Sequence, residues 1–191
     1  MSVQIVEESV SVLHDYGRIS PAFTVEGRFV IHPIESGLGG LALELKPVEP
    51  PYVKDYDRDN GHGPEGWLEQ WDIAHWGVQS AFDGSTRVGG ALIAWNTPQI
   101  HMLDGRKDLA ALWDIRVDGE YRNRGIGSSI FSSAIDWAKE RGCTAMKIET
   151  QDVNVAACRF YAHQGCKLAA IDPFAYADHP EEVQFIWLID L

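Results

Sequence analysis

Three features are scarce in this sequence: long apolar runs, paired cysteines and positive charge. No apolar run reaches the ~18 residues of a membrane-spanning helix, and the opening stretch MSVQIVEESVSV lacks the basic start and apolar core of a signal peptide. Cys143, Cys158 and Cys166 contain no CxxC pair, and their odd number fits a reducing compartment and core packing better than a disulfide framework. We therefore predict a cytoplasmic protein that does not enter a membrane.

The charge balance argues against nucleic acid as a partner. The chain has 28 acidic against 16 basic residues, and its net charge of -12 repels phosphate backbones. The acidic residues gather in two groups. The first contains Asp55, Asp57, Asp59, Glu65, Glu69 and Asp72, and the second contains Asp172, Asp178, Glu181 and Glu182. Such groups either attract a cationic ligand or form solvated surface. The sequence has no GxSxG or HExxH motif and its histidines show no ligand spacing, so we expect neither a serine hydrolase nor a metal site.

The chain is long enough for one compact domain. Its 191 residues are 45% hydrophobic, which is sufficient for a continuous core, so we predict a single domain over residues 1–191. The first half alternates as strands do, and the pattern predicts two hairpins, one over 22–33 and 40–46 and one over 77–82 and 87–95. The Asp-Gly turn at Gly84 supplies the positive φ that a tight hairpin needs. The second strand of this hairpin is strongly apolar and is expected to be central.

The second half alternates strands and helices. Apolar residues recur at helical spacing over 126–138, and Gly142 is suited to the C-terminal cap. Asn154 is suited to cap a short helix over 155–163 that ends at Gly165. The strands predicted around these helices cover 112–117, 145–150, 167–172 and 183–190. This mixed order predicts an α/β (α+β) protein whose N-terminal half is strongly antiparallel.

A glycine-rich turn before the long predicted helix forms a candidate phosphate site, because the N–H groups and the dipole of a helix start attract anions. Gly125 and Gly127 let the backbone approach a ligand closely. Arg122 and Arg124 add positive charge, and the helix carries no acidic side chain before Asp136. This local charge is opposite to that of the whole chain, which favours a phosphate site over a plain glycine turn. The candidate residues are Arg122, Asn123, Arg124, Gly125, Ile126, Gly127 and Ser128.

The spacing of this turn distinguishes among phosphate-binding families. A nucleotide P-loop needs GxxxxGK followed by Ser or Thr, and a dinucleotide fold needs a third glycine where Ile130 stands, so neither pattern fits. The RxxGxG pattern from Arg122 to Gly127, together with the segment 154–161 downstream, resembles the acetyl-CoA pyrophosphate loop of the GNAT acyltransferase superfamily. Other strings resemble the streptothricin acetyltransferases of that superfamily: residues 20–24, 49–57, 113–117, 149–154 and 172–176.

This resemblance implies a fold and an acyl donor. The implied fold is GNAT-like, with a mixed, mostly antiparallel central sheet flanked by helices and with splayed central strands that form the acyl-CoA cleft. Acetyl-CoA is the implied donor, bound mainly by the half that covers 109–165. Its pantetheine arm would bond main-chain groups of Ile115, Arg116 and Val117. Asn154 would be a further partner of the arm, and its competing role is the N-cap of the helix that follows.

The resemblance also implies transfer of the acetyl group to an amine. A lysine-like amine with a pKa near ~10.4 arrives protonated, so a carboxylate, or a water bound to it, must take the proton. Glu149 and Asp114 are the candidates, with Glu149 preferred. The competing interpretation is that both form ion pairs, Asp114 with Arg116 and Glu149 with Lys147. Tyr161 stands where the tyrosine of this family protonates the leaving thiolate, and its competing role is core packing.

The residues leave the acceptor open. The resemblance implies a primary amine on a small cationic molecule, such as the β-lysine moiety of streptothricin. The alternatives are another amine, in a polyamine, an aminoglycoside or a protein N-terminus, and an acetyl-CoA-binding sensor without turnover. Trp67, Trp71 and Trp76 either line an acceptor pocket, because aromatic faces bind cations, or pack in the core. Dimers are frequent among similar proteins, which makes a homodimer a candidate state.

Overall fold

The computed structural model describes residues 3–59, 61 and 63–191. Asn60 and His62, at the start of the tryptophan-containing segment 60–76, lie outside the described residues, as do the first two residues. The chain divides into two compact units, the first made of Met1–Pro21, Asp55–Ile148 and Leu188–Leu191, and the second of Ala22–Lys54 and Glu149–Trp187. The single domain expected from the sequence stays a prediction.

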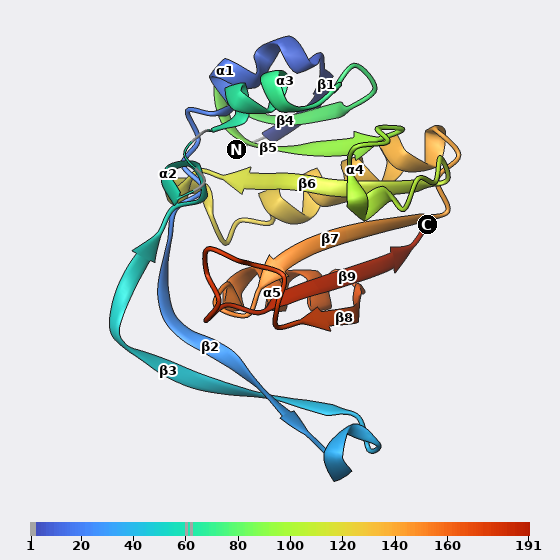
Figure 1. The fold of residues 1–191 in the computed structure, drawn as a ribbon. Helices are drawn as coiled ribbons and strands as arrows, with labels where there is room; N and C mark the ends of the chain where they lie inside the picture. The colour runs from blue at the N-terminus through green and yellow to red at the C-terminus, as the bar shows by residue number, and fades with distance from the viewer. Residues whose placement is uncertain (1–2, 60, 62) are drawn as a thin grey trace. The chain divides into compact units, whose positions relative to one another are not determined.

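The first unit is built on a sheet whose strands follow the order β1-β4-β5-β6-β7 (Figure 1). These strands are β1 (Val3–Glu8), β4 (Gly77–Asp83), β5 (Thr86–Trp95), β6 (Leu109–Val117) and β7 (Ala145–Gln151), which continues into the second unit. Neighbours are antiparallel except for β6 and β7, which are parallel. The predicted hairpin of β4 and β5 is confirmed, with Gly84 at a φ of 60° in its turn. Its apolar second strand lies between two other strands, as expected.

Helix α4 (Ile126–Glu140) packs against β4, β5 and β6 in the first unit. Its buried residues follow the predicted helical spacing and are Ile126, Ile130, Phe131, Ala134, Trp137 and Ala138. Gly77 makes the close approach possible, because a Cβ at this position would lie 2.3 Å from Cε2 of Trp137. Gly142 follows the helix with a φ of 76°, the left-handed conformation expected of a C-terminal glycine.

Short helices of the first unit contribute to a cluster of buried apolar side chains that includes Leu13, Tyr16, Trp67, Trp76 and Leu92. The helices that contribute are η1 (Val10–Val12), α1 (Leu13–Tyr16), α3 (Trp67–Gln70) and η4 (His101–Leu103), and the other short helices of this unit are α2 (Tyr56–Asp59), η3 (Pro64–Gly66) and η5 (Gly119–Tyr121). A helix of about one turn repeats no apolar position, so periodicity gave no prediction for any of them.

The second unit contains the end of β7, helix α5 (Val155–His163), β8 (Lys167–Asp172) and most of β9 (Gln184–Asp190). Its sheet strands follow the order β7-β9-β8. The structure confirms the predicted bounds of α5 and β8. Asn154 caps α5, because its Oδ1 accepts a hydrogen bond from the N–H of Ala157 at 3.1 Å, and Gly165 follows the helix with a φ of 88°.

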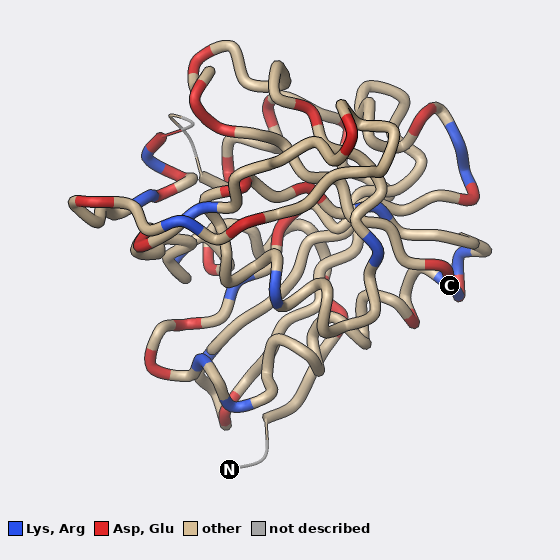
Figure 2. Tube along the Cα trace, turned by 90° about the horizontal axis from the view of Figure 1, so that it is seen from below, with Lys and Arg blue, Asp and Glu red and all other residues tan. Residues whose placement is uncertain are grey.

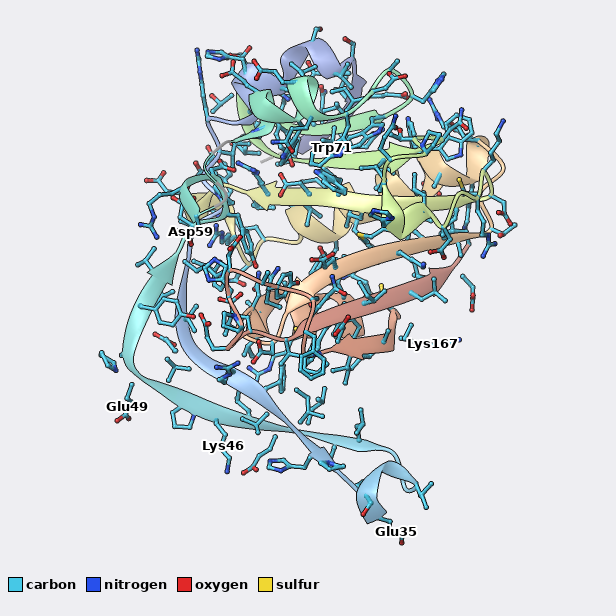
Figure 3. The ribbon with its side chains drawn as sticks, in the orientation of Figure 1. Glu35, Lys46, Glu49, Asp59, Trp71 and Lys167 are labelled. Atoms are coloured by element: carbon cyan, nitrogen blue, oxygen red, sulfur yellow. The ribbon has the colours of Figure 1, made fainter. Side chains whose placement is uncertain are left out.

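The second unit also contains a ribbon of two strands, β2 (Phe23–Pro33) and β3 (Leu41–Lys54), with η2 (Glu35–Gly37) at its tip (Figure 1). The predicted hairpin is confirmed, but β3 continues past the predicted end at residue 46. Pro50 and Pro51 are unusual residues for the interior of a strand. They fit because the register jumps from Val25–Tyr52 to Gly27–Pro47, so both prolines lie in a bulge where no ladder hydrogen bond is required. Figure 3 labels three charged residues of the ribbon, Glu35, Lys46 and Glu49.

Candidate active site

Strand β6 loses one of its two neighbours part-way along its length. Its ladder with β5 continues to Val117, whereas its ladder with β7 ends at Leu112 opposite Ile148. The register with β5 shifts at Trp113, which marks a β-bulge. In the described ladders, the rest of β6 therefore has an edge that no β7 residue covers, and a peptide-like ligand can bond such an edge. This stretch contains the predicted pantetheine partners Ile115, Arg116 and Val117.

The glycine turn leads directly into α4, as predicted. Asn123 and Gly125 adopt the left-handed conformation, with φ angles of 61° and 81°. Gly125 is the N-cap and offers the helix no side-chain hydrogen bond. The first turn has no acidic residue, and it contains the predicted residues Ile126, Gly127 and Ser128. Arg122 and Arg124 are exposed, and Nε of Arg122 donates to the carbonyl of Val117 at 3.0 Å. The helix start therefore has the backbone shape and the charge of an anion site.

Asp114 belongs to a buried ion-pair network. Its Oδ2 accepts hydrogen bonds from Tyr16 Oη at 2.8 Å and from Arg116 Nε at 2.5 Å. The Arg116 side chain is 1% exposed, and its two terminal nitrogens each donate to Asp57 at 2.7 Å. Burial alone would lower the pKa of Arg116, but the charge of Asp114 and the hydrogen bonds to Asp57 raise it. The ion pair that was the alternative to a catalytic role is therefore present at Asp114.

Glu149 lies in different surroundings. Lys147, its expected ion-pair partner, instead bonds Asp104 through Nζ at 2.5 Å, so the ion-pair interpretation of Glu149 is wrong. Oε1 of Glu149 accepts a hydrogen bond from the hydroxyl of Tyr176 at 2.8 Å, and the same hydroxyl accepts one from Nε2 of Gln151 at 3.0 Å. No pattern in the sequence predicts this contact, because Tyr176 is 27 positions from Glu149 in the loop between β8 and β9.

Tyr161 lies on the buried side of α5, with 4% of its surface exposed. Its ring meets the ring of Phe160 edge-on, with the centroids 5.2 Å apart. This burial fits the core interpretation, and the catalytic role stays a prediction. Glu149, Asn154 and Tyr161 belong to the second unit, whereas the phosphate turn and the candidate residues of β6 belong to the first.

Comparison with known proteins decides the family. The family model described as acetyltransferase (GNAT) family matches residues 43–166, which is more than half of the chain. The chain belongs to this family. It is 38% identical over 177 residues to streptothricin acetyltransferase A of Bacillus subtilis (strain 168), covering 92% of each protein. It is 28% identical over 181 residues to streptothricin acetyltransferase of Escherichia coli, covering 95% of this chain and 89% of the relative.

Two solved structures resemble this GNAT acetyltransferase over its whole length. Nourseothricin acetyltransferase is 19% identical, with a TM-score of 0.76 and coverage of 100% of this chain and 99% of that one. The protein assigned as streptothricin acetyltransferase in Bacillus anthracis (strain Ames), solved in complex with acetyl coenzyme A, is 24% identical, with a TM-score of 0.77 and full coverage of both chains. The predicted fold class, a mixed and mostly antiparallel sheet flanked by helices, is confirmed.

Membership of the family also confirms the predicted class of enzyme and its donor. GNAT acetyltransferases transfer an acetyl group from acetyl-CoA, so acetyl-CoA is the donor of this acetyltransferase. None of the described helices is long and apolar enough to cross a membrane.

Most tryptophans of the acetyltransferase that were considered for an acceptor pocket pack in the core. Trp67 and Trp76 are 9% and 6% exposed, and Nε1 of Trp76 donates to Oγ1 of Thr97 at 2.8 Å. Trp71, labelled in Figure 3, is partly buried and meets Trp113 edge-on, with ring centroids 4.8 Å apart. Trp113 lies at the bulge of β6, and sequence reasoning did not single it out. The core interpretation is confirmed for the two buried rings.

Several acidic residues of the acetyltransferase have basic partners within the protein. Figure 2 shows acidic residues along many parts of the trace, with basic residues among them. Asp57 bonds Arg116, and Glu182 accepts a hydrogen bond from Nζ of Lys54 at 2.5 Å. Such carboxylates are already neutralised by a neighbouring cation. The number of acidic residues in the sequence therefore overstates how strongly the protein attracts a cationic ligand.

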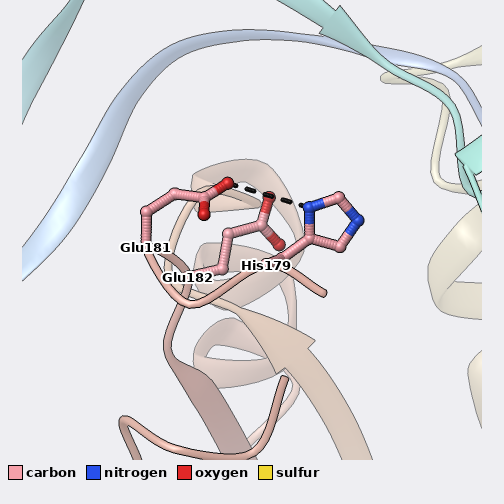
Figure 4. A group of neighbouring side chains, drawn as sticks. All are labelled: His179, Glu181 and Glu182. Carbon is pink, nitrogen blue, oxygen red and sulfur yellow. Dashed lines mark ion pairs between the residues drawn. The ribbon is translucent and has the colours of Figure 1, made fainter. Parts of the chain in front are cut away.

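One three-residue group among the described residues has the composition of a metal site. The ligand atoms of His179, Glu181 and Glu182 lie within 4.8 Å of one another (Figure 4). Glu182 and its partner Lys54 are both buried, with 4% and 6% of their side chains exposed. Because the ammonium of Lys54 already neutralises Glu182, a second cation there would meet repulsion. We therefore assign no metal to this group.

Proposed function

We propose that this acetyltransferase moves the acetyl group of acetyl-CoA to a primary amine of a small cationic acceptor, and that the acceptor is streptothricin, at its β-lysine moiety. The observation that carries the proposal is the 38% identity to a streptothricin acetyltransferase over 92% of both proteins. The second relative of that name extends over 95% of this chain. The proposed place of action is the cytoplasm, and a homodimer is the proposed state.

The proposed donor site begins at the start of α4. The turn from Arg122 to Ser128 binds the pyrophosphate, because a helix start without acidic residues and with two exposed arginines attracts it. Main-chain groups of Ile115, Arg116 and Val117 bond the amides of the pantetheine arm. The side-chain amide of Asn154 contributes a further bond to the arm, while its Oδ1 caps α5.

Glu149 is the proposed general base. Among the described residues, nothing bonds its second carboxylate oxygen, Oε2, which can therefore accept a proton from the acceptor ammonium. The neutral amine then attacks the acetyl carbonyl carbon and, as the carbon–sulfur bond breaks, the nitrogen gives up a second proton to become the amide. The sulfur leaves as a thiolate that takes the proton of the Tyr161 hydroxyl, and the proton released by the nitrogen restores this hydroxyl through solvent. Asp114 is less suited to this role, because a proton on its carboxyl would weaken the ion pair with the buried Arg116.

The proposal is tested by thiol release from acetyl-CoA with a panel of amines. The panel contains streptothricin, lysine, a polyamine, an aminoglycoside and a peptide with a free N-terminus. We expect release to be fastest with streptothricin and its product to carry the acetyl group on the β-lysine amine, as mass spectrometry of fragments would show. Faster release with another amine would show that this amine is the acceptor, and the protein would still be an acetyltransferase.

The same experiment distinguishes an enzyme from an acetyl-CoA sensor. A sensor would bind acetyl-CoA in a calorimeter and release no thiol above the rate without acceptor. We expect release to depend on the acceptor concentration and to saturate. Binding of acetyl-CoA without release for any amine of the panel would overturn the proposed function.

A further inference from the structure

Tyr176 connects two residues of the strand that carries the proposed base. Glu149 and Gln151 are two positions apart on β7, so their side chains lie on the same face of the strand. Tyr176 approaches this face from the loop 173–183 between β8 and β9, and its hydroxyl bonds both side chains. All three residues belong to the second unit and are partly buried.

The direction of these hydrogen bonds is fixed by chemistry. The side-chain nitrogen of Gln151 can only donate, so the phenol oxygen of Tyr176 accepts from it at 3.0 Å. The single phenol proton then points to Oε1 of Glu149, 2.8 Å away. This hydrogen bond occupies one oxygen of Glu149 and leaves the other for a substrate proton.

The loop that carries Tyr176 has a hydrogen-bonded turn at its start and a buried anchor at its end. At its start, the N–H of Phe174 donates to Oδ1 of Asp172 at 2.8 Å. At its other end, Asp152, which is fully buried, accepts from the N–H of Val183 through Oδ1 at 2.8 Å, and its own N–H donates to the carbonyl of Val183 at 2.9 Å. Glu182, whose buried ion pair with Lys54 is described above, is the residue directly before Val183. Hydrogen bonds near both ends limit the conformations of the loop, so less conformational entropy is lost when the Tyr176 side chain is held in one position.

We propose that Tyr176 is a positioning residue for Glu149, holding the carboxylate oriented so that Oε2 takes the proton of the acceptor ammonium. This inference rests on the proposed function and adds a residue to it. Tyr176 acts through Glu149 and touches neither the donor nor the acceptor in this proposal. Gln151 contributes by orienting the phenol.

The test compares Y176F, which removes only the hydroxyl, with the wild type in the thiol-release assay. We expect kcat with streptothricin to fall about tenfold, the effect of losing one hydrogen bond to a charged group, while KM for acetyl-CoA and the melting temperature stay the same. Q151L should lower kcat in the same direction by about twofold to threefold. The matched control is Y52F, because Tyr52 is an exposed tyrosine of the same unit, 42% exposed on β3, and it should have the kcat of the wild type.

A double-mutant cycle separates positioning from general damage to the site. E149Q should lower kcat by at least about a hundredfold, as the loss of a general base does. If Tyr176 acts through Glu149, Y176F should have almost no further effect in the E149Q background. A tenfold effect in both backgrounds, or a wild-type kcat for Y176F, would overturn the inference and leave the proposed function in place. A wild type that releases no thiol with any amine would overturn both.

Discussion

Arg116 joins three parts of the first unit through its side chain. It bonds Asp114 on its own strand, Asp57 in α2 and the carbonyl of Ile19. The substitution R116M removes the cation and leaves two carboxylates that are only 25% and 15% exposed. We expect R116M to lower the free energy of unfolding by about 3 kcal/mol, because breaking a buried ion pair leaves charge uncompensated. Urea denaturation measures the difference.

The control for this prediction is R106M. Arg106 forms two hydrogen bonds with one carboxylate, Asp108, but both side chains are 49% exposed. Water screens such a pair, so little stability should be lost with it. A loss for R116M that is no larger than the loss for R106M would show that burial of the network contributes nothing.

The sequence predicted single residues well where their role depends on neighbours along the chain. Gly125 has the left-handed conformation that the turn required, and Asn154 caps the helix that it precedes. Partners across the fold were not predictable in this way. Lys147 is two positions from Glu149 and was expected to pair with it, yet it bonds Asp104. The partner that Glu149 does have, Tyr176, comes from a loop whose path no local pattern reveals.

The start of α4 is the element on which donor affinity should depend. Two exposed arginines precede a first turn without acidic residues. Replacing both, in R122Q/R124Q, should raise the Kd for acetyl-CoA about tenfold at low salt, because two charge-assisted contacts with the pyrophosphate are lost. The difference should shrink as salt increases, since exposed charges are screened. Isothermal titration calorimetry at two salt concentrations measures both effects.

The control on the same helix is K139Q. Lys139 is exposed in the last turn of α4, far along the helix from the turn at Gly125, and its loss should leave the Kd for acetyl-CoA unchanged. An equal change in Kd for K139Q and for the double variant would mean that net charge, not the helix start, sets the affinity. If neither K139Q nor R122Q/R124Q changed the Kd for acetyl-CoA, the two arginines of the turn would not contribute to donor binding.

At the scale of elements, periodicity succeeded for long elements and failed for short or irregular ones. The structure confirms α5 at its predicted bounds. It also confirms α4, which ends two residues after the predicted apolar pattern of 126–138. Both helices bury one face, which is why their periodicity is clear. The extension of β3 was missed, since prolines usually end a strand and here lie in a bulge. The edge strand β1 was missed as well, because apolar and polar residues do not alternate throughout Val3–Glu8, where the apolar Val6 is exposed.

At the scale of the whole molecule, the order of strands and helices predicted the α/β class, and the resemblance implied the GNAT-like sheet. Alternation indicated strands and helices, but it could not show that β2 and β3 form a sheet of their own or that β6 is parallel to β7. Whether the hairpin of β2 and β3 joins the other strands, and which way β7 runs beside β6, depend on segments far apart in the chain. The pattern from Arg122 to Gly127, together with the segment 154–161 and the other strings that resemble the family, supplied the missing long-range information, because the resemblance implied a fold.

The three cysteines report on the unfolding of the whole molecule. Cys143 belongs to the first unit, and Cys158 and Cys166 belong to the second, and all three are buried. Burial raises the pKa of each thiol, to about 11 for Cys158 and for Cys166, so little thiolate exists near neutral pH. The native protein should therefore react slowly with a disulfide reagent such as DTNB, which also allows DTNB to measure coenzyme A release without interference.

Labelling these thiols at increasing urea concentration tests whether the chain is one domain. Strands β7 and β9 each run through both units, so an opening that breaks either strand disrupts both. We expect all three cysteines to become reactive at the same urea concentration, as in a cooperative two-state transition. Mass spectrometry of the labelled peptides assigns each reaction to its cysteine. If Cys143 reacted at a different urea concentration from the two cysteines of the second unit, the units would unfold independently and the single-domain prediction would be wrong.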